Sequence, residues 1–304
     1  MGCPKACLLS LRERIFLKSF FAVWLLKLLA YLPADWADRT GRTLGRRLDA
    51  GNSRAARTTR ANVALAFPEL DHAAQRWLVR ASLKDMGEKA ARMARVWVRR
   101  ENNPDKIQDP ENYHLFTDAL AAGEGVILLV PHLGNWELLG QWVSEHGPLN
   151  AMYRPAKLEG IDALVLAGRQ SQGYQVHPTN MQGVAGLLKA LKRGEMVAVL
   201  PDQEPDAAGG AWATFFGQQA FTMTLAQKIA QKRSQARVIL ASAVKKERRR
   251  YQVVLRAVDP AFSEDGGLQH MNDAIEALVR EYPAQYQWEY KRFSTQPDGR
   301  QLYP

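Results

Sequence analysis

A short apolar run that ends at a proline constrains this chain more than any other feature. Val126 to Val130 is unbroken hydrophobic sequence, with Gly125 before it and Pro131 after it. Five apolar residues between such breakers predict a strand buried on both faces, which is typical of a parallel or mixed sheet. Helical spacing begins at Asn135, so we expect His132 in the turn between strand and helix. Open α/β sheets place their chemistry at this end of a core strand.

A second stretch repeats the pattern. Met196 to Leu200 is apolar and is followed by Pro201, Asp202 and Gln203. Two parallel strands that end in this way would bring Asp202 and Gln203 to the same edge as His132. Further strands are expected at 151–153, 237–244 and 251–258, with helical segments between them. The sequence therefore predicts an α/β fold with a mixed, mostly parallel sheet flanked by helices.

The spacing between His132 and Glu137 suggests acid–base chemistry. Residues five apart on a regular helix point roughly 140° away from each other, so the two side chains meet only if His132 precedes the helix. Glu137 would then accept a hydrogen bond from one imidazole nitrogen, and the other nitrogen would take a proton from a hydroxyl. The same spacing also fits a histidine in a tight turn beside a solvated glutamate.

Two arginines and three acids are further candidates. The guanidinium of Arg154 or Arg169 could bind a phosphate or carboxylate through two hydrogen bonds, although each could equally be an ordinary surface arginine. The acids at 202, 204 and 206 alternate like metal ligands, but no histidine or cysteine accompanies them, so we predict no metal site. The only cysteines, Cys3 and Cys7, allow no disulfide framework, which fits a reducing, cytosol-facing domain.

The N-terminal sixty residues indicate contact with a membrane. Ile15 to Leu32 is the only long apolar stretch, and its eighteen residues would span about 27 Å as a helix, the short limit for crossing a bilayer. Lys18 and Lys27 lie on opposite sides of that helix. Residues 1–60 carry twelve basic and four acidic side chains, most of the +10 net charge of the chain. We therefore expect a retained anchor over residues 1–34, embedded or spanning, rather than a cleaved signal peptide.

Several motifs carry a resemblance to a known family. HLGNWE, at residues 132–137, resembles the His-x4-Asp/Glu motif of the glycerolipid acyltransferase superfamily. More closely, the chain resembles the late acyltransferases of lipid A biosynthesis, the lauroyl and myristoyl transferases. The other segments that match this family in order are NVALAFPEL (62–70), MYRP (152–155), PDQ (201–203), TFFG (214–217) and QYQWEYKRF (285–293). The resemblance covers nearly the whole chain, from about residue 10 to its end.

The resemblance implies a membrane-associated O-acyltransferase. It would move a fatty acyl chain from acyl carrier protein to a hydroxyl of an acylated lipid A precursor, with no bound cofactor or metal. Its catalytic residues would be His132, as general base, and Glu137, which orients it; Arg154, Arg169, Asp202 and Gln203 would bind substrate. Residues 35–304 would form one acyltransferase domain, helical over 35–104 and α/β over 105–304. The enzyme would lie at the bacterial inner membrane with this domain facing the cytoplasm.

Other readings of the sequence remain open at this point. An acyltransferase of the same superfamily could act on another membrane glycolipid, phospholipid or aminolipid. A non-enzymatic lipid- or nucleic-acid-binding protein would explain the charge but not the His132 turn, so we expect no nucleic-acid partner. A serine hydrolase lacks support, because the chain has no G-x-S-x-G elbow. Phe215, Phe216 and Phe221 fit an acyl pocket or plain core, and the basic turn 245–250 fits a solvated hairpin tip or a contact with acyl carrier protein.

Overall fold

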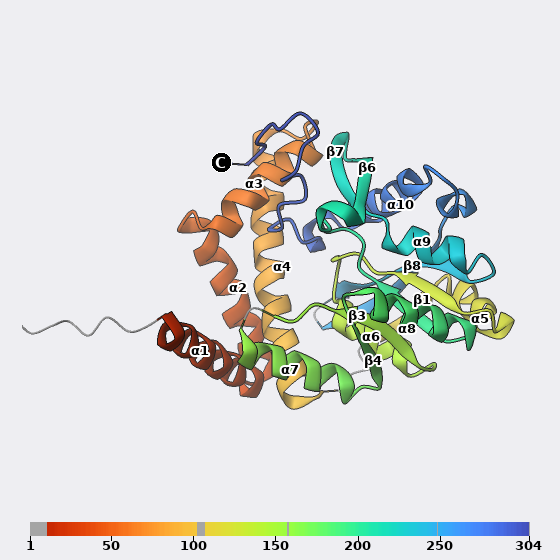
Figure 1. Ribbon diagram of the computed structural model, residues 1–304. Helices are drawn as coiled ribbons and strands as arrows, with labels where there is room; N and C mark the ends of the chain where they lie inside the picture. Colours follow the sequence, from red (N-terminus) through yellow and green to blue (C-terminus); the bar gives the residue numbers. More distant parts are fainter. Residues whose placement is uncertain (1–10, 102–106, 157, 248, 304) are drawn as a thin grey trace, which may run out of the picture.

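The computed structural model describes residues 11–101, 107–156, 158–247 and 249–303 (Figure 1). Cys3 and Cys7 lie outside this part of the chain. The helices are α1 (Leu11–Tyr31), α2 (Ala34–Ala50), α3 (Arg54–Ala66), α4 (His72–Arg99), α5 (Tyr113–Ala122), α6 (Trp136–Ser144), α7 (Glu159–Gln170), α8 (Met181–Lys192), α9 (Leu225–Lys232) and α10 (Leu268–Glu281). The strands are β1 (Ile107–Glu111), β2 (Val126–Leu129), β3 (Leu149–Tyr153), β4 (Tyr174–Pro178), β5 (Met196–Val199), β6 (Gly210–Phe215), β7 (Gln218–Met223), β8 (Arg237–Glu247) and β9 (Arg250–Ala257).

The main sheet has seven strands in the order β1-β9-β8-β2-β5-β3-β4. The pairings within it are parallel except that between β8 and β9, which is an antiparallel hairpin. The predicted mixed, mostly parallel sheet with flanking helices is confirmed. β2 lies between β8 and β5, and its residues are fully buried because helices cover both faces of the sheet. A separate two-stranded sheet is formed by β6 and β7.

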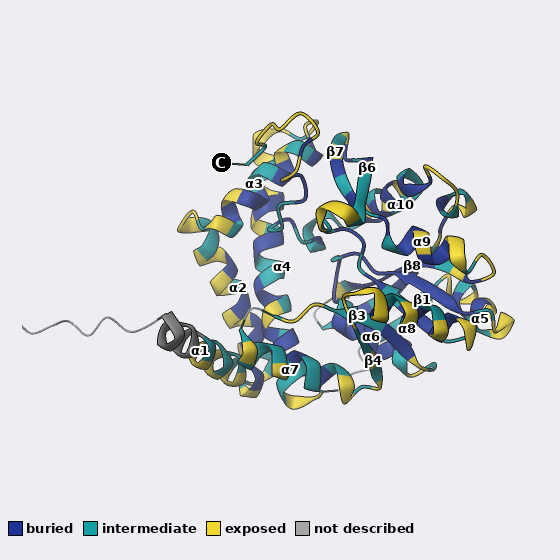
Figure 2. Ribbon diagram, viewed as in Figure 1, coloured by how far each residue is buried: buried dark blue, intermediate teal, exposed yellow. Residues whose placement is uncertain are grey.

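Two hydrophobic clusters separate the faces of the main sheet. One contains Leu128 and Val130 of the β2 segment with Leu139 and Val143 of α6. The other contains Ile127 and Leu129 with residues of α8, α9 and α10. Alternate residues of one strand thus face different helical layers, as the pleat requires. Figure 2 shows the buried strands between these layers.

Helices α2 and α4 pack closely against each other, beside the sheet domain (Figure 1). A Cβ atom at Gly41 or Gly45 of α2 would overlap the α4 backbone, so only glycine permits this approach. The charges between the two helices and the β8–β9 hairpin are largely paired. Asp38 binds Arg92, with an Nε–Oδ1 distance of 3.0 Å, and Arg249, with an Nε–Oδ2 distance of 3.3 Å.

Part of the basic turn at 245–250 is tied to the helices, while Lys246, Glu247 and Arg250 are exposed. Lys245 binds Glu88 of α4, Arg249 reaches Asp35 and Asp38 of α2, and Lys246 donates to the Tyr282 hydroxyl at 2.6 Å. These three cations are engaged within the chain.

Helix α1 lies along the outside of the helical layer. Its described part packs on α4 and α7, and the Ser19 hydroxyl accepts from the Gly160 N–H at 3.2 Å. Phe20, Phe21 and Trp24 are more than half exposed. Within the described chain, no helix combines the length and the hydropathy needed to cross a membrane.

Candidate active site

The strand-to-helix turn after β2 is held from several sides. Gly134 has a φ of +63°, and a Cβ atom there would overlap the Ala243 carbonyl of β8, so the tight turn requires glycine. The Asn135 side chain accepts from the Leu138 N–H at 3.2 Å and caps α6. Because α6 begins only at Trp136, His132 lies before the regular helix, as predicted.

His132 is anchored by Asp202, from the segment that follows β5. The imidazole Nδ1 lies 2.8 Å from Asp202 Oδ1, and the His132 backbone N–H donates to Oδ2 at 2.9 Å. A carboxylate accepts hydrogen bonds, so Nδ1 carries the proton and Nε2 of the neutral ring has the free lone pair. Asp202 is only 3 % exposed and is not among the residues that line the cavity described below. Its position behind the ring suits it to hold the imidazole rather than to bind substrate.

The electrostatics of Asp202 favour its charged form. Burial raises the pKa of the Asp202 carboxyl. Electrostatic attraction to His132, together with the hydrogen bonds from the His132 ring and backbone N–H, lowers it by more, so the pKa lies below its ordinary value. The hydroxyl of the buried Tyr286 also hydrogen-bonds to the Asp202 carboxylate. Burial, followed by the Asp202 charge, raises the pKa of Tyr286 well above its ordinary value, so it remains a hydroxyl donor.

The other side of the imidazole faces two glutamines. Gln203 Nε2 lies 3.3 Å from His132 Nε2 and donates to Gln287 Oε1 at 3.0 Å. Gln287 belongs to a C-terminal segment that runs beside the His132 turn. An amide donor therefore lies where His132 would receive a proton from a substrate hydroxyl.

The segment from Gln285 to Gln287 forms the back wall of this turn. Its backbone pairs with the turn at two points, the Gln287 N–H donating to the His132 carbonyl at 3.1 Å and the Gly134 N–H to the Gln285 carbonyl at 3.1 Å. Asn62 of α3 holds the continuation of the segment, donating to the carbonyls of Trp288 at 2.6 Å and Tyr290 at 2.7 Å. The motifs at 62–70 and 285–293 therefore support the site from behind.

The side-chain hydrogen bonds of His132 and Glu137 go to other residues, so the predicted hydrogen bond between them is wrong. The Glu137 carboxylate pairs with Arg169 of α7, at 2.6 Å from Oε1 to Nη2 and 3.4 Å from Oε2 to Nε. The reason is geometric: Asp202 fixes the imidazole from the strand side, while the first turn of α6 directs Glu137 towards α7. Burial lowers the pKa of Arg169, but the Glu137 charge outweighs it and raises that pKa.

The two candidate arginines differ in their surroundings. The Arg169 side chain is 19 % exposed and is paired, whereas that of Arg154 is 75 % exposed. The Arg154 Nη2 atom lies 3.5 Å from Oδ1 of Asp206, whose side chain is also exposed. Such an exposed pair is weak, so the Arg154 guanidinium can exchange this partner for an anionic ligand.

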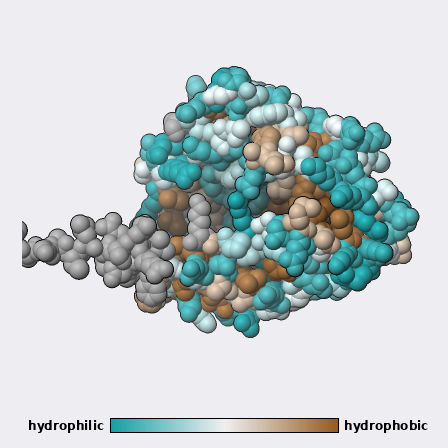
Figure 3. Space-filling view, in the orientation of Figure 1, coloured by the Kyte–Doolittle hydropathy of each residue, from teal (hydrophilic) through white to brown (hydrophobic). Residues whose placement is uncertain are grey.

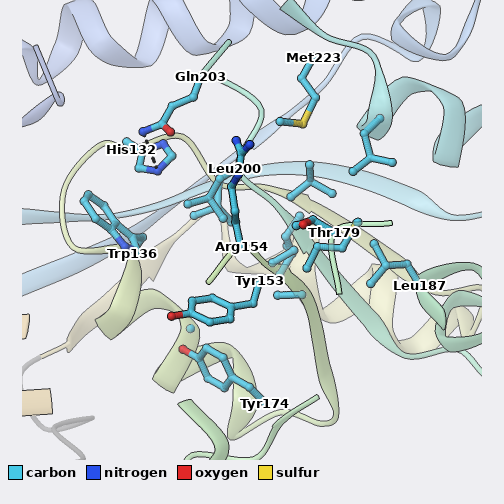
Figure 4. Close-up of a pocket in the computed structure, with 18 of the residues that line it drawn as sticks. His132, Trp136, Tyr153, Arg154, Tyr174, Thr179, Leu187, Leu200, Gln203 and Met223 are labelled. Atoms are coloured by element: carbon cyan, nitrogen blue, oxygen red, sulfur yellow. Dashed lines mark hydrogen bonds between the residues drawn. The ribbon is translucent and has the colours of Figure 1, made fainter. Parts of the chain in front are cut away.

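A cavity of about 550 Å³ opens beside His132. It is lined by His132, Glu137, Arg154, Arg169 and Gln203, together with many apolar residues. In Figure 4, His132 and Trp136 lie at one side of it and Leu187 at the other, with Arg154 between them. Figure 3 shows apolar side chains bordering a hollow in the corresponding face of the molecule. The site therefore joins a histidine–carboxylate pair to a largely apolar chamber.

Two other sets of candidates have different places in the structure. Phe215 and Phe216 are buried against each other and against the C-terminal aromatic residues. Neither of them lines the cavity, and Phe221 does not line it either.

Of the alternating acids, Glu204 accepts from the Ser294 hydroxyl at 2.7 Å and the Thr295 N–H at 3.0 Å. No cluster of three or more metal-ligating side chains occurs in the part of the chain that the structure describes.

The backbone amides of the turn are already engaged. The N–H groups of His132, Leu133, Gly134 and Asn135 donate to Asp202, Pro131, Gln285 and Ala243, respectively. These four N–H groups are therefore not available to stabilise an oxyanion. A side-chain donor does lie beside the imidazole Nε2, the Gln203 amide at 3.3 Å.

Comparison with known proteins identifies the family. The family model for bacterial lipid A biosynthesis acyltransferases matches residues 7–295. A lipid A biosynthesis acyltransferase of Haemophilus influenzae is 26% identical over 93% of this chain and 91% of its own. Two Escherichia coli relatives are a lipid A biosynthesis lauroyltransferase, 24% identical over 97% of both chains, and a palmitoleoyltransferase, 25% identical over 79% of both. The chain therefore belongs to the bacterial lipid A biosynthesis acyltransferase family.

Proposed function

We propose that this enzyme transfers a fatty acyl chain from the thioester of acyl carrier protein to a hydroxyl of an acylated lipid A precursor. The observation that carries the proposal is the His132–Asp202 pair at the wall of a largely apolar cavity. The pair supplies a base, and the cavity has room for a hydrocarbon chain. The names of the relatives support lipid A as the acceptor and a fatty acyl group as the cargo.

In the proposed mechanism, His132 Nε2 removes the proton of the acceptor hydroxyl as its oxygen attacks the thioester carbonyl carbon. The tetrahedral intermediate collapses with cleavage of the carbon–sulfur bond, and the imidazolium returns the proton to the departing thiolate. Asp202 stabilises the imidazolium and fixes the tautomer. General-base assistance of this kind typically contributes about 10²–10⁴ in rate. The Gln203 amide, 3.3 Å from Nε2, is placed to donate to the reacting oxygen.

The second pair, Glu137 with Arg169, has a supporting role in this proposal. It joins α6 to α7 at the cavity wall, and both its charges are satisfied by each other. Arg154 is the cation we assign to an anionic group of the acceptor, because it is exposed and lines the cavity. The residues proposed to contact substrate or the reacting atoms are therefore His132, Gln203 and Arg154, while Arg169 forms part of the cavity wall through its pair with Glu137.

The proposed place of action is the cytoplasmic side of the inner membrane. One side of α1 packs on α4 and α7, while Phe20, Phe21, Trp24, Leu25 and Leu28 are exposed. We propose that this exposed apolar side enters the lipid interface, with residues 1–34 as the anchor and residues 35–304 as the acyltransferase domain. Aromatic side chains and the basic N-terminal region favour an anionic interface.

Mass spectrometry of lipid A tests the proposal. Cells lacking the gene are complemented with the wild type or with His132→Ala, and the acyl groups on lipid A are counted. We expect the wild type, but not His132→Ala, to restore one missing acyl chain. Unchanged lipid A with a shift in another lipid would overturn the acceptor. Full restoration by His132→Ala would overturn the mechanism, provided that both proteins accumulate equally.

A further inference from the structure

The cavity lies at the carboxyl ends of strands of the main sheet, and residues from both faces of the sheet line it. Leu128, Ala198 and Leu149 belong to, or pack against, the hydrophobic cluster on the α6 side. Val199 and Leu187 belong to the cluster on the α8 side, against which Met152 and Met223 also pack. Adjacent residues of a strand point to opposite faces, so the cavity has an α6-side lobe and an α8-side lobe.

The α6-side lobe extends along strand β3. It is lined by Tyr153 at the carboxyl end of β3, then Ala151, then Leu149, which spans about 13 Å along the strand. Halfway down, Ala151 and Ala198 are register partners, and their small side chains leave the lobe open. At its floor, Leu149 is the register partner of Tyr174 of β4. The lobe is thus open along its length and closed at the level of Tyr174.

Tyr174 is held in this position by its neighbours. A Cβ atom at Gly140 of α6 would overlap the Tyr174 hydroxyl, so the absence of a side chain there makes room for the ring. The hydroxyl donates to the Glu137 carbonyl at 3.4 Å. Val143, one turn further along α6, lines the same lobe. Ring volume at 174 and side-chain volume at 140 and 143 therefore set the space at the floor.

We propose that the donor acyl chain occupies the α6-side lobe and that Tyr174, seated on Gly140, sets the longest chain accepted. This inference rests on the proposed acyl transfer. The lobe begins beside His132 and Trp136, where the thioester carbonyl must lie. It is lined by the apolar residues Leu139, Val143 and Ala151, together with Glu137 and Arg169, whose charges neutralise each other. Relatives of similar identity have names with different acyl groups, lauroyl and palmitoleoyl, so membership of the family leaves this specificity to local residues.

The test measures transfer by the full-length enzyme in membranes from a graded series of saturated acyl thioesters of acyl carrier protein. We expect Tyr174→Ala to move the preferred chain to a longer one and Val143→Phe to a shorter one. A poorly fitting methylene changes discrimination by about 10–200-fold, so a shift of one two-carbon step is measurable. Tyr174→Phe keeps the ring and is expected to keep the wild-type profile.

Met223→Ala is the matched control, because it enlarges the α8-side lobe instead. A longer preferred chain in Met223→Ala, with no shift in Tyr174→Ala, would place the acyl chain in the other lobe and overturn the inference. Unchanged profiles in both Tyr174→Ala and Val143→Phe would also overturn it. Thermal unfolding identifies a variant that fails to fold, in which case the oppositely directed variant decides. If the wild type accepts none of the thioesters, the proposed function itself fails.

Discussion

Two hydrogen-bonded side-chain pairs lie at the wall of one cavity, yet they are built differently. In the His132–Asp202 pair, the carboxylate is buried behind the ring and the ring presents its second nitrogen towards the cavity. In the Arg169–Glu137 pair, two contacts join the groups and each charge is neutralised by the other. The first arrangement leaves a base available for reaction, whereas the second closes on itself. The difference assigns proton transfer to one pair and support to the other.

Asp202→Asn should have the largest effect among changes that leave the imidazole in place. An amide cannot stabilise the imidazolium and can select the wrong tautomer, so we expect kcat to fall about 10²–10⁴-fold. Initial rates with an acyl thioester donor measure this. The exposed Asp265→Asn serves as a control for loss of one negative charge. A rate within twofold of wild type for Asp202→Asn would remove Asp202 from the mechanism.

The site edge of the sheet could be predicted from local sequence, because the apolar runs that contain β2 and β5 are each followed by a proline and a polar residue. That pattern predicts His132 and Asp202 at the same end of the sheet, where their side chains are hydrogen-bonded. The partner of His132 could not be chosen in the same way. Glu137 is near it in sequence, but Asp202 reaches the ring because β2 and β5 are adjacent in the sheet. Sequence proximity was the weaker guide.

The contacts of the C-terminal segment also could not be predicted from the sequence. Its motif at residues 285–293 contributes to the family resemblance, but no spacing indicates that Tyr286 reaches Asp202 or that Gln287 reaches Gln203. These contacts depend on Asn62, more than two hundred residues away in the chain, which binds the same segment. Long-range packing of this kind has no local periodicity from which it could be read.

Glu137→Gln should affect stability more than chemistry. It leaves the largely buried Arg169 without its counter-charge, so we expect about 2–4 kcal/mol less free energy of unfolding. Replacing both partners, as Glu137→Gln with Arg169→Met, should cost less than the sum of the single changes. Denaturant unfolding measures these values, with Asp298→Asn in the exposed pair with Arg300 as the control, expected near 0–1 kcal/mol. A loss of kcat matching that of Asp202→Asn, without loss of stability, would contradict the assignment.

Acid pH should reduce the contribution of the His132–Asp202 pair to the free energy of unfolding. The pKa of Asp202 is lower in the folded protein than its ordinary value of 3.8, so its contribution to stability is present above that value. It is lost as pH falls through the lower folded pKa. The difference in unfolding free energy between wild type and Asp202→Asn should therefore shrink as the pH is lowered below about 4. A difference that grows in this range would show that the folded pKa is raised instead.

Tyr286→Phe should give the smallest effect and separate support from direct contact with substrate. The change removes one donor to Asp202 while both bonds from His132 remain, so we expect kcat to fall only about 3–10-fold. KM should stay near the wild-type value, because Tyr286 does not line the cavity. Tyr282→Phe, which removes only a hydroxyl bonded to Lys246, controls for loss of a tyrosine hydroxyl elsewhere. A rise in KM with kcat unchanged would place Tyr286 in substrate binding, because a group that acts only through Asp202 alters the reactivity of the base and leaves the binding surfaces as they are.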